Sequence, residues 1–164
     1  MSGTGEWATP QNFFDAASKQ LGPFHIDLAA KAHNTKCVDY ISPERDSLAQ
    51  DVVWVDKCHT TCWLNPPFSN IKDWIKKAYE QTQLNRHAKI VVLCRIAPST
   101  KWWMNYVPRA GEVLLIGGKR VQFEPPPNTE SSGNPQECCL VVFTHNDYVG
   151  YDNPEIYIWD WTEE

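Results

Sequence analysis

Residues 62–68 read Cys62-Trp63-Leu64-Asn65-Pro66-Pro67-Phe68, in which three apolar residues are followed by an asparagine and a double proline. Residues 62–64 predict a short buried strand. Two consecutive prolines cannot continue that strand, because proline has no amide N–H to donate to a neighbouring strand. Ligands of open α/β sheets bind outside the carboxyl ends of the strands. We therefore expect a functional site at Asn65.

The turn at residues 65–68 suits the recognition of a planar amino group. An amino group conjugated to an aromatic ring is a poor nucleophile, because its lone pair is delocalised. We expect the side-chain oxygen of Asn65 and the backbone carbonyl of Pro66 to accept its two hydrogens, while Pro66 and Pro67 keep the turn rigid. Phe68 offers a ring on which an extruded base can stack. The alternative is a plain strand-ending turn in which Asn65 is only a cap.

Helices are predicted on both sides of this turn. Thr9 and Pro10 suit the start of a helix that Gly22 ends. Downstream, a second helix follows Ser69 or Asn70. Its apolar face is formed by residues at helical spacing, namely Ile71, Trp74, Ile75 and Ala78.

Strands account for most of the remaining periodic segments. Residues 89–95 form a continuous apolar run, which is typical of a strand covered on both faces. Further strands are expected at 24–29, 37–41, 112–116, 137–144 and 155–160, and a Pro-rich loop at 125–133. This order predicts an α/β fold with a mostly parallel central sheet flanked by helices, and antiparallel strands near the C-terminus.

Length and charge limit the function classes. The chain has 164 residues, enough for a single domain over 1–164 with a core at about 6–160. Its net charge of −5 argues against a general nucleic-acid coat. Many of the Lys and Arg residues nevertheless fall between 72 and 120, which is compatible with a local basic face. The sequence contains no apolar run of membrane-spanning length, and we expect a cytoplasmic protein without a secretory leader.

The cysteines predict packing rather than crosslinks or metal binding. All six are expected to be free thiols in a reducing compartment. Cys58-His59-Thr60-Thr61-Cys62 together with Cys37 has some of the spacing of a zinc site. No second clear ligand pair accompanies it, so we expect no metal.

Read in order, these segments resemble the phage-type DNA N-6-adenine methyltransferases, the Dam-like phage enzymes. The resemblance runs from Glu6 to about Phe143. It is carried by Trp102 and by residues 6–11, 13–15, 22–30, 46–48, 65–69, 91–93, 119–123 and 140–143. It implies a single-domain Rossmann-like fold that uses S-adenosylmethionine to methylate a flipped adenine in DNA, and a role in protecting phage DNA from host restriction.

The resemblance also implies roles for individual residues. The catalytic residues would be Asn65, Pro66, Pro67 and Phe68. The cofactor would contact Thr9, Pro10, Asp27, Leu28, Ala29, Ala30, Asp46, Leu48 and Asn65. Phe123 would face Phe68 across the base; a core position for Phe123 is the alternative.

DNA contacts are expected around the same site. Lys119 and Arg120 would meet phosphates, and Trp102 would stack on bases unless it packs in the core. The chain leaves no room for a separate recognition domain. We therefore expect short or relaxed sequence specificity, with contacts from loops 96–111 and 124–136. The sequence does not indicate an oligomeric state.

Two departures from the family pattern leave rival functions open. The turn after Asp27 lacks the glycines common in methyltransferases, and Phe68 stands where tyrosine is commoner. One rival is methylation of another planar amino group, on cytosine, RNA or protein glutamine. The other is a non-catalytic domain that binds nucleic acid or the cofactor.

Overall fold

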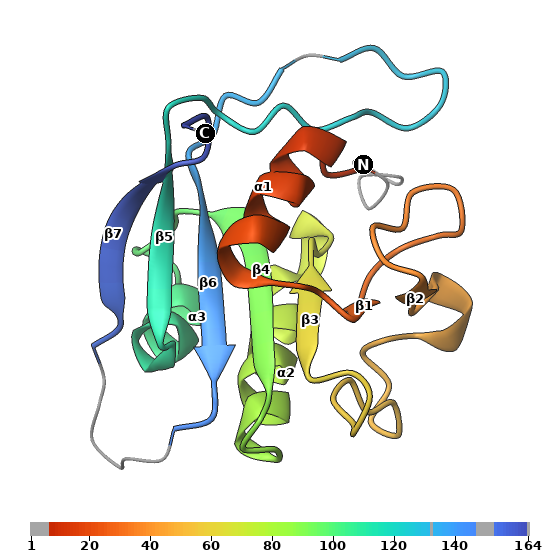
Figure 1. Ribbon diagram of the computed structural model, residues 1–164, viewed down its shortest axis with the longest axis vertical. Helices are drawn as coiled ribbons and strands as arrows, with labels where there is room; N and C mark the ends of the chain where they lie inside the picture. The colour runs from red at the N-terminus through yellow and green to blue at the C-terminus, as the bar shows by residue number, and fades with distance from the viewer. Residues whose placement is uncertain (1–6, 132, 147–152, 164) are drawn as a thin grey trace.

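A seven-stranded sheet forms the centre of the computed structural model, which describes residues 7–131, 133–146 and 153–163 (Figure 1). The strands are β1 (Ile26–Asp27), β2 (Asp39–Tyr40), β3 (Thr61–Leu64), β4 (Lys89–Arg95), β5 (Glu112–Gly117), β6 (Cys138–Thr144) and β7 (Glu155–Asp160). The α-helices are α1 (Gln11–Leu21), α2 (Ile71–Gln83) and α3 (Lys101–Tyr106). Short 3-10 turns are η2 (Pro43–Arg45), η3 (Phe68–Asn70) and η4 (Val107–Arg109). The predicted strands are confirmed in their number and approximate positions.

The sheet is mixed, which corrects the expectation of a mostly parallel one. Its order is β2-β1-β3-β4-β6-β5-β7. β1, β2, β3 and β4 pair in parallel, as do β5 and β7. β6 lies between β4 and β5 and runs against both, and its seven-residue ladder with β4 is the longest in the sheet. β5 and β6 are consecutive and antiparallel, so the long loop between them does not have to cross the sheet, whereas parallel neighbours need a crossover connection.

Helices cover both faces of the sheet. Figure 1 shows α1 on the near face and α2 and α3 on the far face. Trp63 of β3 packs with Phe13 and Phe14 of α1, whereas its neighbours Cys62 and Leu64 pack on the side of α2. This alternation follows from the two-residue period of a strand. It explains why β3 is apolar at every position from 62 to 64.

The connections create a switch point between β1 and β3. From β1 the chain moves to β2 on one side, and from β3 it moves to β4 on the other side. The connections that leave the carboxyl ends of β1 and β3 therefore run in opposite directions along the sheet. Crevices at such points are the usual ligand sites of open α/β sheets. None of the helices in the described ranges is long and apolar enough to cross a membrane.

Candidate active site

A cleft opens at this switch point, above the carboxyl ends of β1 and β3. Its lining includes Trp7, Thr9, Asp27, Ala29, Lys36 and Asn65. Asp27 pairs with Trp63 in the parallel ladder, and the Leu28 N–H donates to the Trp63 carbonyl at 2.9 Å. These contacts place the end of β1 beside Asn65. Two segments that the resemblance assigns to the cofactor site therefore lie side by side.

The side-chain amide of Asn65 has a defined orientation. Its Nδ2 donates to the backbone carbonyl of Trp7 at 3.2 Å. A carbonyl only accepts hydrogen bonds, so this contact fixes which end of the amide faces Trp7. Within the described residues Oδ1 of Asn65 has no hydrogen-bond partner. The oxygen is thus free to accept a hydrogen from a ligand.

Asp27 is a buried carboxyl group at the edge of the cleft, with a side chain only 3% exposed. Its oxygens accept from the backbone N–H groups of Ala29, at 3.3 Å, and Lys36, at 3.0 Å. Burial raises the pKa of Asp27 to about 6, against the lowering effect of these two hydrogen bonds. The carboxyl is therefore mainly ionised at neutral pH, although burial disfavours its charge.

The other predicted cofactor residues of the N-terminal segment and the β1 turn also lie at this edge. Thr9 is buried and lines the cleft, and Pro10 directly precedes α1. Leu28 and Ala30 are buried, and Ala29 lines the cleft. The turn follows β1 without a glycine.

The segment that contains Asp46 and Leu48 is tied to this turn through Ser47. Ser47 Oγ donates to the Leu28 carbonyl at 2.5 Å. Asp46 is exposed, has a φ of 53° and accepts from the Leu48 N–H at 3.2 Å. Asp46 and Leu48 are not among the residues that line the cleft, and the Ser47–Leu28 hydrogen bond connects their segment to the turn beside it.

Phe68 and Phe123 come together, although they are far apart in the sequence. Phe68 is 39% exposed. The two ring centroids are 6.2 Å apart and the rings are nearly perpendicular, at 87°. Pro66, between Asn65 and this ring pair, is buried, and Pro67 is partly exposed. The turn at 65–68 thus joins the polar cleft to an accessible aromatic pair.

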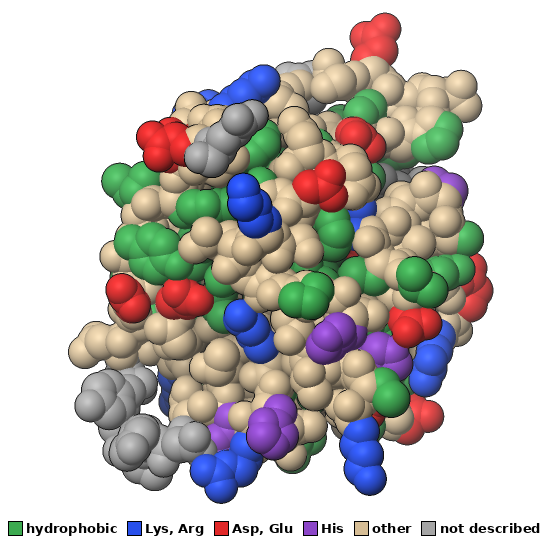
Figure 2. Space-filling view, viewed as in Figure 1, with side chains coloured by type: hydrophobic (Ala, Val, Ile, Leu, Met, Phe, Trp, Pro, Cys, Tyr) green, Lys and Arg blue, Asp and Glu red, His purple; other side chains and the backbone are tan. Residues whose placement is uncertain are grey.

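The predicted DNA-contacting residues have different environments. Lys119 is exposed. Arg120 is exposed but bonds to Glu137, with its Nη2 2.6 Å from the carboxylate Oε1. Trp102 is only 6% exposed and belongs to the core beneath α3, which favours its alternative reading as a packing residue. The face in Figure 2 shows Lys and Arg side chains scattered among acidic ones, with no continuous basic patch among the described side chains of this face.

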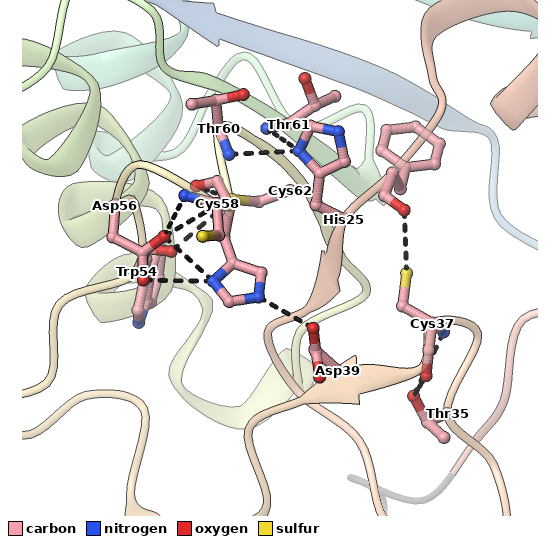
Figure 3. A network of polar contacts seen from close by, with 12 residues as sticks. His25, Thr35, Cys37, Asp39, Trp54, Asp56, Cys58, Thr60, Thr61 and Cys62 are labelled. Atoms are coloured by element: carbon pink, nitrogen blue, oxygen red, sulfur yellow. Dashed lines mark hydrogen bonds and ion pairs between the residues drawn. The ribbon is translucent and has the colours of Figure 1, made fainter.

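The segment from Cys58 to Cys62, which has some of the spacing of a zinc site, lies near the amino ends of β1 and β3 and forms hydrogen bonds there. His59 bonds to Asp39 through Nε2, at 2.9 Å, and to Asp56 through Nδ1, at 3.1 Å (Figure 3). In the same region, His25 Nδ1 accepts from the N–H groups of Thr60 and Thr61. Among the described residues no group of three possible ligands is arranged to hold a metal ion. All six cysteines are free.

Sequence comparison connects this geometry to a family. A family model described as DNA N-6-adenine-methyltransferase (Dam) matches residues 2–153. The chain belongs to this family. The resemblance read from the sequence is confirmed, and the matched range contains the cleft, the 65–68 turn and Phe123.

Individual relatives agree with the family assignment. The chain is 34% identical over 141 residues to a DNA N-6-adenine-methyltransferase of Haemophilus phage HP1, covering 84% of this chain and 77% of that protein. It is 31% identical over 110 residues to a DNA N-6-adenine-methyltransferase of Escherichia phage T1, covering 67% of this chain and 44% of that protein. A putative methyltransferase of Escherichia coli is 33% identical over 66 residues. Membership of a methyltransferase family implies a methyl donor.

The structure adds residues that the sequence reading did not assign to the site. The carbonyl of Trp7 and the backbone N–H of Lys36 act through main-chain groups, which no residue pattern marks. Lys77 is not part of the apolar face predicted for its helix, yet it is buried and donates to the carbonyls of Ser47 and Ala49.

Proposed function

We propose that this protein is an S-adenosylmethionine-dependent DNA adenine methyltransferase. The target adenine would turn out of the duplex and enter between the cleft and the Phe68–Phe123 pair, with its exocyclic amino group at Asn65. The observation that carries this proposal is the orientation of the Asn65 amide, whose nitrogen is held by Trp7 and whose oxygen is available at the switch point. With a DNA substrate the reaction would take place in the cytoplasm of the cell that holds the DNA.

Two acceptors at the turn would prepare the amino group. The Oδ1 of Asn65 and the carbonyl of Pro66 would each accept one hydrogen. Acceptors on both hydrogens hold the nitrogen in place and favour the tetrahedral geometry in which its lone pair is available. Pro66 and Pro67 restrict the backbone here, so this arrangement exists before the substrate arrives. No side-chain base is needed before the transfer, because the nitrogen can release its proton afterwards.

The residues at the end of β1 fit a cationic ligand. S-Adenosylmethionine supplies an electrophilic methyl group and carries positive charge on its sulfonium and amino groups. Asp27 keeps a carboxylate in a buried position, where a nearby cation would offset the unfavourable desolvation. Thr9, Asp27 and the Ala29 turn would hold the cofactor, and Pro10, Leu28, Ala30, Asp46 and Leu48 would shape its surroundings.

The aromatic pair would bind the base by stacking. Every base has a flat face, and stacking on an aromatic side chain contributes about 1–3 kcal/mol for each base. Phe68 is exposed enough to offer its ring, and Phe123 stands against it. Lys119 would contact a phosphate. Loops 96–111 and 124–136 would make the remaining DNA contacts, which predicts short or relaxed sequence specificity.

The test is a methyl-transfer assay with product analysis. The purified protein and Asn65→Ala are each incubated with unmethylated DNA and S-adenosylmethionine labelled with tritium in the methyl group. The DNA is then digested and its nucleosides are separated. We expect label in N-6-methyladenine with the wild type and its loss with Asn65→Ala.

Other outcomes would identify the rival functions. Label in cytosine, or only in added RNA or protein, would show that the enzyme methylates an amino group other than that of DNA adenine. A folded protein that binds the cofactor and labels nothing would be a non-catalytic domain. A normal rate from Asn65→Ala would refute the role of the Asn65 amide.

A further inference from the structure

We propose that the backbone bridge between Ala8 and Glu124 is a positioning element, which aligns the Asn65 amide and couples this alignment to the aromatic pair of the base site. This inference rests on the proposed function, because it assumes that Asn65 holds the amino group of the substrate. Its three links are the contacts Asn65–Trp7, Ala8–Glu124 and Phe123–Phe68.

The first link restrains the rotation of the amide. Among the residues that the structure describes, Nδ2 of Asn65 has one acceptor, the Trp7 carbonyl at 3.2 Å. Without this acceptor, nothing in the described part of the chain distinguishes the two ends of the amide. If the amide were reversed, its NH2 group would face the amino group of the substrate, donor against donor. The position of the Trp7 carbonyl therefore decides whether Asn65 can accept.

The second link holds Trp7 from its neighbour in the chain. The N–H of Ala8 donates to the Glu124 carbonyl, and the N–H of Glu124 donates to the Ala8 carbonyl, both at 2.9 Å. This reciprocal pair fixes the peptide units around Ala8. On the other side, Thr9 is buried at 2% exposure. The 118–124 segment therefore holds Trp7 in position through Ala8.

The third link is that the same segment supplies the second aromatic ring. Phe123 precedes Glu124 directly, and its ring contacts that of Phe68. The segment itself is anchored, since Val121 is 1% exposed in the core and its carbonyl accepts from Asn134 Nδ2 at 3.0 Å. A base that stacks on Phe123 therefore contacts the same segment that holds Trp7 in position. Stacking and the alignment of the amide depend on one stretch of backbone.

Proline substitution at position 124 tests the bridge. Glu124→Pro removes the N–H that bonds to Ala8, whereas the control Glu124→Ala changes the same side chain and keeps that bond. We expect Glu124→Pro to lower kcat by about 10- to 100-fold relative to Glu124→Ala, because small misplacements of a reacting group have effects of this order. Both variants should still bind S-adenosylmethionine in calorimetry, which would show that the lower kcat does not come from loss of the fold. Equal kcat in the two variants would overturn the proposal.

A second variant tests the first link directly. Asn65→Asp keeps an acceptor for the substrate, but a carboxylate cannot donate to the Trp7 carbonyl. A protonated carboxyl group can donate. We expect the ratio of mutant to wild-type kcat to be small at about pH 8 and to rise as the pH is lowered towards the ordinary carboxyl pKa of about 4. A ratio near one at every pH would show that Trp7 has no role.

The two kinds of failure can be distinguished. A wild type that makes no N-6-methyladenine would refute the proposed function itself. Suppose instead that the wild type makes N-6-methyladenine, that Glu124→Pro and Glu124→Ala have the same kcat, and that the kcat of Asn65→Asp relative to wild type does not change with pH. This result would refute only the positioning role of the bridge.

Discussion

Lys77 places its ammonium group on the backbone carbonyl of Ser47, at an Nζ–O distance of 2.6 Å. It also donates to the Ala49 carbonyl at 2.7 Å and lies over the ring of Trp54. Trp54 Nε1 donates to the same Ser47 carbonyl at 2.9 Å, and Ser47 Oγ reaches the Leu28 carbonyl. A charge on α2 is therefore connected through two hydrogen bonds to the turn after β1.

Replacing this lysine should loosen the 46–49 segment. Lys77→Met keeps most of the apolar stem but removes both charged hydrogen bonds. We expect the free energy of unfolding to fall by about 1–3 kcal/mol, as is usual for hydrogen bonds to charged groups. The KM for S-adenosylmethionine should rise more than kcat falls. The adjacent exposed lysine gives a matched control, and Lys76→Met should be close to the wild type in urea unfolding and in both kinetic constants. Equal effects of the two substitutions would contradict this role of Lys77.

Removing the Phe68 ring should weaken the use of DNA. We expect Phe68→Ala to lower kcat/KM for DNA by about 10- to 100-fold, which corresponds to the loss of about 1–3 kcal/mol of base stacking. Phe68→Tyr keeps the ring face and should retain most of the activity. Leu84→Ala, at a side chain 77% exposed at the end of α2, is the control for loss of surface apolar area. Steady-state rates on one DNA duplex measure the effect, and an unchanged Phe68→Ala rate would exclude stacking at this ring.

Binding of the methyl donor should depend on pH through Asp27. Burial raises the pKa of Asp27 to about 6. The group is therefore an anion above this pH and neutral below it, and only the anion attracts a cationic ligand. We expect the affinity for S-adenosylmethionine, measured by calorimetry, to fall as the pH drops through about 6. Asp27→Asn should bind weakly and lose this pH dependence. A pH-dependent affinity that persists in Asp27→Asn would assign the effect to another group.

The His59 contacts should stabilise the fold mainly at low pH. Hydrogen bonds to Asp39 and then to Asp56 raise the pKa of His59. The folded state thus binds the proton more tightly than the unfolded state. The resulting stability is fully present below the ordinary histidine pKa of about 6.5 and is lost as the pH rises through the raised value.

The corresponding measurement is thermal unfolding of His59→Ala at several pH values. Its Tm should lie furthest below that of the wild type in acid, and the difference should narrow as the pH rises. His87→Ala, at an exposed histidine, serves as the control. A constant difference at all pH values would mean that His59 acts by packing alone.

The positions of the strands could be predicted from the sequence because apolar runs and prolines act on the residues next to them. The buried run at 89–95 and the double proline after Leu64 led directly to β4 and to the end of β3. The place of β6 between β4 and β5 was not predicted, since strand order depends on pairing between distant segments. The continuous apolar run of β6 fits several neighbouring strands equally well.

The sequence named those residues of the candidate site that would act through their side chains and missed those that would act through the backbone. Asn65, Asp27 and the Phe68–Phe123 pair were named from the sequence and lie around one edge of the sheet. The Trp7 carbonyl was missed because every residue has a carbonyl. Lys77 was missed because helical periodicity placed it with its exposed neighbours, whereas the 46–49 segment covers it.

The position of β6 affects the order in which the structure can be completed. β6 follows both β4 and β5 in the chain, and within the described sheet β5 does not pair with β4 directly. A growing chain that has formed β1–β4 already contains Asp27 and Asn65. Until β6 is synthesised, β5 is not joined to β4, and the segment with Phe123 and Glu124 that follows β5 lies beside an incomplete sheet. The aromatic pair and the Ala8–Glu124 bridge are therefore among the last features that the nascent protein acquires, after the polar cleft at β1 and β3.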